Sequence, residues 1–292
     1  MRGVLQSCRM YLVGVAAVLV ATLLCPTEVQ AARGCGSPSR SDSVARLPVG
    51  HGEISGFVAS RRHPGVGWMI RDSGHPPSLY ALHFGSGGGP WSREFRVAGA
   101  DNRDWEDMSY SVGPDGRGRL WIVESTQSGR DPFIYEVLEP DPDKGKVAKL
   151  VRRYRFRYPD RGFTNTEASF FYNGDLIVVT KTAPARLYRF GGLSDRWVNR
   201  PRFVGELRGA DRVSVARPSP DHSTLVTSDH DTVTVFRGPA PGSPLAAFTY
   251  EAPAKRKMVA PGDNIEAGDY FPSGSCDVLM LSERRNVYRL RD

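Results

Sequence analysis

The segment Ser78-Leu79-Tyr80-Ala81-Leu82 has four counterparts later in the chain. These are Phe133-Ile134-Tyr135-Glu136-Val137, Arg186-Leu187-Tyr188-Arg189-Phe190, Thr232-Val233-Thr234-Val235-Phe236 and Asn286-Val287-Tyr288-Arg289-Leu290. Their central residues follow one another at steps of 55, 53, 46 and 54 residues. Each segment alternates with the two-residue period of a β-strand, so the spacing predicts a structural repeat of about 50 residues.

Each repeat contains further strand-like elements. An acid opens the first one: Glu53, Glu106, Glu167, Asp211 and Glu266. An apolar second strand follows at 67–72, 120–124, 176–181, 225–229 and 278–283, and the first four repeats add a weaker fourth strand at 91–98, 147–158, 201–207 and 245–251. Four strands in about 50 residues are typical of a β-propeller blade. We therefore predict an all-β propeller of five four-stranded blades.

The last repeat ends after its third strand. Residues 41–49, before the first repeat, can supply the missing strand, so that the two ends of the chain pair and leave no open edge. The alternatives are a β-sandwich and a six-bladed propeller with one decayed repeat.

The first 31 residues have the layout of a secretory signal peptide. Arg2 and Arg9 precede an apolar run at 11–25, and Val29-Gln30-Ala31 offers a cleavage site. We expect secretion and one propeller domain at 32–292, with an uncleaved anchor or a lipoprotein at Cys25 as alternatives. No apolar run reaches the 18 residues of a membrane span.

Cleavage would leave two cysteines, Cys35 and Cys276. An even pair in an exported chain predicts one disulfide, with two free thiols as the alternative. The composition, 40% hydrophobic and 24% charged, excludes a disordered chain. The mature chain would carry 39 − 2 = 37 basic and 32 − 1 = 31 acidic residues, a net charge of +6.

The repeated acids have one predicted location. In an up-and-down blade the start of the first strand and the end of the second lie on the same face, so these acids should surround one mouth of the central channel. The candidate ligand-binding residues are Glu53, Asp72, Asp104, Trp105, Glu106, Asp107, Glu167, Lys181, Asp211 and Glu266, and the candidate metal ligands among them are Glu53, Glu106, Glu167, Asp211 and Glu266.

Clustered carboxylates repel one another and need neutralisation. Neighbouring Arg71, Arg103, Lys181, Arg212 and Arg284 are one source. Bound calcium, which takes six to eight oxygen ligands, is a second. A third interpretation of the same acids is catalytic: two of them form a carboxylate pair, or they hold a metal ion that activates a water molecule.

A resemblance rests on short motifs. Asp101-Asn102-Arg103-Asp104-Trp105-Glu106-Asp107-Met108, with residues 53–57, 71–74 and 165–168, resembles a group of secreted actinobacterial β-propeller proteins with a DWED-type motif, and is more distantly similar to esterase-like phytase-type propellers. An excess of arginine over lysine fits such a source. The resemblance implies the propeller fold and no substrate.

Known catalytic and metal motifs do not appear in the sequence: it has no Gly-x-Ser-x-Gly, no His-Glu-x-x-His and no phosphate-binding loop. The densest basic stretch, residues 152–158, reads as an outer blade strand whose charges discourage edge pairing, rather than as a nucleic-acid site. We expect a monomeric exported protein that presents its acidic mouth to a ligand, a cation or a protein partner. The alternative is a metal-assisted hydrolase of an ester, lactone, phosphate or glycoside.

Overall fold

The computed structural model describes residues 35–36, 38–84, 90–125, 130–159, 165–238, 245, 254–257, 262–271 and 276–291. The predicted signal peptide at 1–31 lies outside these residues. The regular structure of the described residues consists of β-strands, and none of their segments forms a helix long and apolar enough to cross a membrane.

The strands follow one another as antiparallel neighbours. The first sheet contains β2 (Ile54–Ala59), β3 (Val66–Arg71), β4 (Ser78–His83) and β5 (Trp91–Ala98), together with β6 (Trp105–Val112), β7 (Gly118–Glu124), β8 (Phe133–Leu138) and β9 (Val147–Arg155). Short parallel pairing of β5 with β9 joins these two groups of four strands into one eight-stranded sheet.

Two more sheets repeat the four-stranded pattern. One contains β10 (Thr166–Tyr172), β11 (Asp175–Thr180), β12 (Ala185–Phe190) and β13 (Arg202–Leu207). The other contains β14 (Val215–Pro218), β15 (Thr224–Asp229), β16 (Thr232–Arg237) and β17 (Ala254–Lys257). The fourth strand predicted at 245–251 lies, apart from residue 245, outside the described residues, and the described fourth strand of this sheet is β17.

The last sheet joins the two ends of the described chain. β18 (Ile265–Tyr270), β19 (Val278–Ser282) and β20 (Asn286–Arg291) are completed by β1 (Arg40–Arg46), which pairs with β20 from Arg40↔Arg291 to Arg46↔Asn286. This confirms the predicted closure by the N-terminal strand.

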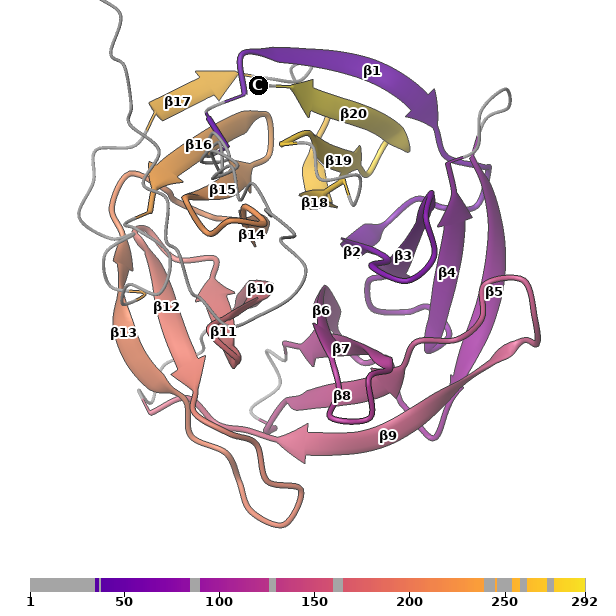
Figure 1. Cartoon of the computed structure of the whole chain (residues 1–292). Helices are drawn as coiled ribbons and strands as arrows, with labels where there is room; N and C mark the ends of the chain where they lie inside the picture. Colours follow the sequence, from indigo (N-terminus) through magenta and orange to yellow (C-terminus); the bar gives the residue numbers. More distant parts are fainter. Residues whose placement is uncertain are drawn as a thin grey trace, which may run out of the picture. The chain divides into compact units, whose positions relative to one another are not determined.

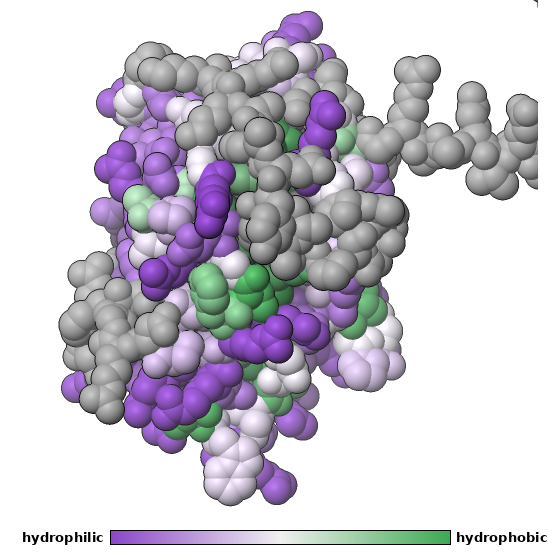
Figure 2. Space-filling model, turned by 90° about the vertical axis from the view of Figure 1, so that its left-hand side faces the viewer, coloured by the Kyte–Doolittle hydropathy of each residue, from purple (hydrophilic) through white to green (hydrophobic). Residues whose placement is uncertain are grey.

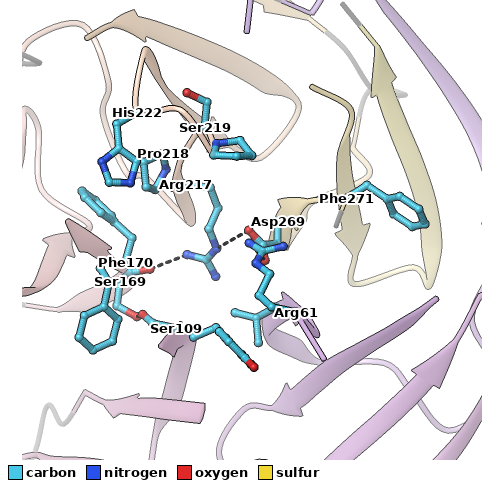
Figure 3. A pocket seen from close by; sticks show the side chains of 14 residues that line it. Arg61, Ser109, Ser169, Phe170, Arg217, Pro218, Ser219, His222, Asp269 and Phe271 are labelled. Atoms are coloured by element: carbon cyan, nitrogen blue, oxygen red, sulfur yellow. Dashed lines mark hydrogen bonds and ion pairs between the residues drawn. The ribbon is translucent and has the colours of Figure 1, made fainter. Parts of the chain in front are cut away.

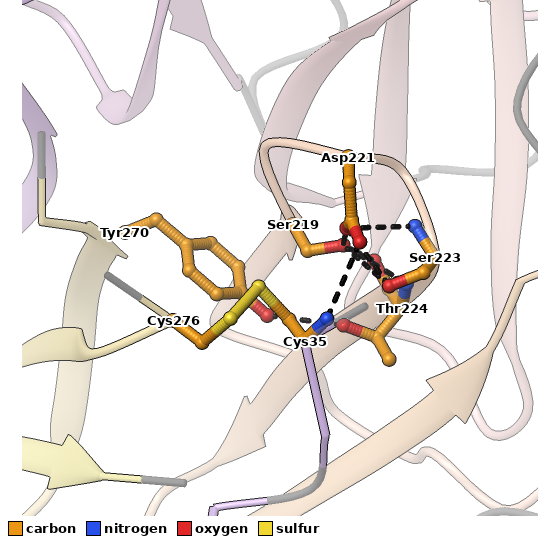
Figure 4. The surroundings of a disulfide bond; sticks show 7 residues. All are labelled: Cys35, Ser219, Asp221, Ser223, Thr224, Tyr270 and Cys276. Carbon is orange, nitrogen blue, oxygen red and sulfur yellow. Dashed lines mark hydrogen bonds between the residues drawn. A yellow bond between two sulfur atoms is a disulfide. The ribbon is translucent and has the colours of Figure 1, made fainter. Parts of the chain in front are cut away.

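The predicted disulfide between Cys35 and Cys276 is also confirmed. It connects the segment before β1 to the start of β19, and the Cys35 amide donates a hydrogen bond to Oδ2 of Asp221 at 3.3 Å (Figure 4). Asp221 lies in the turn between β14 and β15, so the bridge also contacts the neighbouring sheet.

The innermost strands form a closed circuit. β2 contacts β6, β6 contacts β10, β10 contacts β14, β14 contacts β18, and β18 contacts β2. Figure 1 shows the sheets arranged radially around this centre. Four-stranded antiparallel sheets with the first strand innermost are the architecture of a β-propeller, so the predicted fold is confirmed at this level.

Burial follows distance from the centre. β2 is buried along its whole length because neighbouring sheets cover both of its faces, whereas the outer strand β9 alternates between exposed and buried residues.

The inner strands approach closely: a Cβ atom on Gly56 would lie 2.8 Å from the backbone nitrogen of Met108. The flank that includes β12 and β13 is mainly hydrophilic, with a smaller hydrophobic patch (Figure 2).

Candidate functional site: an acidic channel mouth

A β-bulge occurs near the start of β2, β6, β10 and β18. The register skips one residue at each bulge, namely Ser55, Glu106, Glu167 and Glu266. The register of β14 and β15 places Ser214 at the equivalent position. The extra residue of a bulge is released from the ladder, so these side chains can turn toward the channel mouth.

The repeated position predicted from the sequence was therefore wrong in two repeats. Ser55 and Ser214 occupy it, not Glu53 and Asp211. Glu53 precedes β2 with φ of 54°, is 68% exposed and pairs with His75. Asp211 is exposed and lies before β14. A bulge shifts the two-residue period by one, which an alternation pattern cannot reveal.

Three acids of the mouth lie together. Asp72 follows β3, Asp104 precedes β6 and Glu106 is the bulge residue of β6; one carboxylate oxygen from each lies within 4.8 Å of the others. Asn102 connects the two segments, because its Nδ2 donates to the carbonyl oxygens of Arg71 and Asp72 at 3.0 and 2.9 Å. The Asn102 side chain thus holds the segment before β6 against the backbone at the end of β3.

Burial and mutual repulsion make this cluster costly to ionise. Desolvation, followed by the charge of Asp72, raises the pKa of Asp104 to about 6. Desolvation, followed by the charge of Glu167, raises the pKa of Glu106 to about 10. Within the described residues, none of Asp72, Asp104 and Glu106 forms an ion pair with a basic side chain. The cluster favours any species that brings positive charge.

The other side of the mouth is partly neutralised. Nζ of Lys181 donates to Oε2 of Glu167 at 2.9 Å. Glu266 faces Nδ1 of His230 at 3.7 Å, and burial raises the pKa of Glu266 to about 8. The mouth therefore combines five carboxyl groups (Asp72, Asp104, Glu106, Glu167 and Glu266) with Lys181, and an electronegative character remains.

Other acids near the mouth are neutralised internally, as one sequence-based alternative proposed. Glu124 is fully buried and accepts two hydrogen bonds from Arg103, at 3.1 and 2.6 Å, and one from the amide of Phe133 at 3.0 Å. The two explanations of acid neutralisation thus apply to different residues. Glu124 and Glu167 have basic partners, whereas Asp72, Asp104 and Glu106 have none in the part of the chain that the structure describes.

Two candidate ligand-binding residues have structural surroundings instead. Trp105 is fully buried, its ring packs against Tyr135, and its Nε1 donates to the carbonyl oxygen of Asp101 at 3.0 Å. Asp107 is 1% exposed and accepts hydrogen bonds from Arg217 inside the channel. The acidic stretch of β6 therefore points alternately to the mouth and to the channel interior.

Arg217, on β14, fills the channel between the two mouths. Its guanidinium binds the Asp107 carboxylate through both Nη atoms at 2.9 and 2.7 Å. It also donates to the carbonyl oxygens of Phe57, Met108 and Ser169 at 3.1, 2.9 and 2.6 Å. With Nε at 3.9 Å from Asp269, this side chain contacts β2, β6, β10 and β18 from β14.

The opposite mouth is a separate hollow of about 340 Å³ above Arg217. Figure 3 shows Arg61, Asp269 and the hydroxyls of Ser109, Ser169 and Ser219 around it. Arg61 donates to Asp269 at 3.1 Å and to the carbonyl oxygen of Tyr270 at 3.1 Å. This mouth combines Arg61 and Arg217 with the single carboxylate of Asp269, whereas the other combines five carboxyl groups with Lys181. The sequence analysis did not single out Arg217. An arginine within the buried inner strand Val215–Pro218 could have indicated a buried charge that needs a partner in the channel.

Many chains of known structure match this one, among them a set of WD40 repeats. The structure resembles the WD40 repeats of RRP9, with a TM-score of 0.46 and 9% sequence identity, over 86% of this chain and 99% of that one. No family model and no curated protein matches the sequence. The propeller assignment therefore rests on the strand topology and the contacts among the inner strands.

Proposed function

We propose that this protein is an exported five-bladed β-propeller that binds a divalent cation, calcium, at its acidic mouth. In this proposal the blades are β2–β5, β6–β9, β10–β13, β14–β17 and β18–β20 with β1. The observation that carries the cation site is the approach of three carboxylate oxygens, from Asp72, Asp104 and Glu106, to within 4.8 Å of one another.

The chemistry of the donors favours calcium. The three side chains offer only carboxylate oxygens, which suit hard cations such as Ca²⁺ and Mg²⁺ and not the nitrogen and sulfur sites of zinc. Flexible coordination at 6–8 oxygens suits calcium at a partly open mouth. A bound cation would hold Asp104 and Glu106 ionised and offset the burial and the repulsion that together raise the pKa of each.

Thermal unfolding in calcium and in excess chelator tests this function. Extracellular calcium modules bind with Kd of about 0.1–1 mM, so about 10 mM calcium should stabilise the folded state by about 1.4–2.7 kcal/mol. Asp104→Asn should remove this response. Asp211→Asn, an exposed acid outside the cluster, is the matched control and should keep it. An unchanged Tm in calcium, or an equal rise in Asp104→Asn, contradicts the proposal.

Metal-assisted hydrolysis is the second candidate. It is favoured by Lys181, whose ammonium lies beside the mouth at 2.9 Å from Glu167 and would bind an anionic ester near a cation held by Asp104 and Glu106. Turnover of a phosphomonoester and a carboxylic ester in calcium tests it. Lys181→Met should abolish turnover while the calcium-dependent Tm rise remains; turnover that survives this change contradicts the assignment.

A further inference from the structure

A second concave surface lies on the outer flank of the ring, where β8 and β9 meet the connection between β12 and β13. It is a groove of about 240 Å³ lined by Phe133, Arg153, Arg155, Asp195, Arg196 and Trp197. β8 and β9 form one wall, and the connection between β12 and β13 forms the other. Figure 1 shows this connection projecting outward beyond the ends of β12 and β13.

The connection is fastened to β9 by Asn199. The backbone amide of Asn199 donates to the carbonyl oxygen of Arg155 at 2.8 Å, and its carbonyl accepts from the amide of Arg157 at 2.9 Å. Its side chain exchanges hydrogen bonds with the backbone of Ser194, both at 2.8 Å. Trp197, between these points, is 73% exposed. The backbone on either side of this exposed indole is thus held in place, which makes the indole a candidate stacking platform.

Positive charge surrounds this platform. Arg153 lies over the ring of Phe133 at 5.4 Å, and Arg155 is 3.9 Å from Asp131. Arg196 has no acidic partner among the described residues. Asp195, 44% exposed, is the one acid of the groove and lies 3.5 Å from Arg152. Arginine forks pair well with carboxylates, so the groove suits an anionic ligand.

The mixed chemistry favours a sugar chain over a nucleic acid. A single-stranded nucleic acid needs successive aromatic platforms along a continuous basic track, whereas Trp197 is the one strongly exposed aromatic side chain that lines this groove. Sugar hydroxyls, by contrast, can donate hydrogen bonds to Asp195. The groove is smaller than the pockets that enclose whole small molecules, so it would hold one or two units of a chain that continues past it.

We propose that this flank groove binds an acidic polysaccharide of the uronate class. Trp197 stacks on one face of a sugar ring, Arg153 and Arg196 pair with its carboxylates, and Asp195 accepts hydrogen bonds from its hydroxyls. The site is independent of the cation proposed at the channel mouth.

Titration of the purified protein with oligogalacturonate, followed by tryptophan fluorescence and calorimetry, tests the site. Chelator is present throughout, so that calcium bridging and the channel mouth do not contribute. We expect saturable binding that weakens with salt, and at least a tenfold loss of affinity in Trp197→Ala and in Arg196→Glu. Trp91→Ala is the matched control, since Trp91 is also exposed, at 50%, and stacks on His83 of another strand pair.

Far-UV circular dichroism and Tm check that each variant is folded. Affinity unchanged in both Trp197→Ala and Arg196→Glu, or an equal loss in Trp91→Ala, overturns the proposal. Equal binding of neutral dextran would show that the arginines recognise no charge and would also overturn it. Equal or tighter binding of single-stranded DNA would identify a general polyanion surface and reject the polysaccharide assignment.

Discussion

The Arg217–Asp107 pair at the centre of the channel gives a direct test of what holds the ring together. Both side chains are almost completely buried, with 4% and 2% exposure, and the pair is bidentate. Removing one partner of such a pair costs about 3–5 kcal/mol, because the other charge stays buried. Arg217→Met would also leave the carbonyl oxygens of Phe57 and Met108 without their donor.

This free energy converts into a measurable shift. A domain of about 260 residues has an unfolding entropy of about 0.55 kcal/mol/K, so a loss of 3–5 kcal/mol lowers Tm by about 5–9 °C. Thermal and urea unfolding of Arg217→Met measure it. Arg117→Met, which breaks the exposed pair with Asp115, is the control and should cost about 1 kcal/mol or less.

A double variant separates charge from packing. Replacing both partners, as in Asp107→Leu with Arg217→Met, removes the buried charges together and should be more stable than the sum of the two single losses predicts. The reasoning is refuted if Arg217→Met unfolds within about 0.5 kcal/mol of the parent protein, or if the double variant loses the full sum of the two single losses.

Three further predictions concern other parts of the ring. In chelator, the free energy of unfolding should fall as the pH rises from about 5 to 8, because burial raises the pKa of Glu266 to about 8 in the folded protein. The stability that protonated Glu266 contributes is complete below its unfolded pKa and is lost as the pH rises through its folded pKa. Glu266→Gln should therefore flatten the dependence of Tm on pH. Replacing Cys35 and Cys276, 241 residues apart, with serine should cost about 5 kcal/mol by loop entropy, measured by urea unfolding against the oxidised protein; no difference would assign the closure to β1 alone. Gly56→Ala should cost about 1–3 kcal/mol in the same assay because its Cβ would meet the Met108 backbone, and an unchanged midpoint would contradict the close approach.

The strands themselves were predictable because their signal is local. The third strand of each repeat, such as Ser78–His83 or Phe133–Leu138, alternates within a few residues, and turn residues delimit it. The closure was predictable for a different reason: the last repeat lacks a strand, and residues near 41–49 have no other repeat to join. The pairing of Cys35 with Cys276 followed from there being two cysteines in the expected mature chain.

The composition of the acidic mouth depended on tertiary structure. A bulge decides which residue at the start of an inner strand turns to the mouth, so Ser55 and Ser214 replaced the predicted Glu53 and Asp211. The division between paired and unpaired acids has a similar origin. Lys181 pairs with Glu167, and no basic side chain of the described residues pairs with Asp104, because distances between separate strands set these contacts.

The sequence by itself therefore determined the repeat, the strand order, the ring closure and the class of residue at the mouth. These properties depend on residues that are neighbours in the chain or on simple counts. Only the tertiary structure decided that Arg217 fills the channel and that Trp197 stands beside Arg153 and Arg196 on the flank. Asp107 and Phe57 beside Arg217, and Arg153 beside Trp197, are supplied by other sheets far away in the chain, and no local pattern records which of them meet.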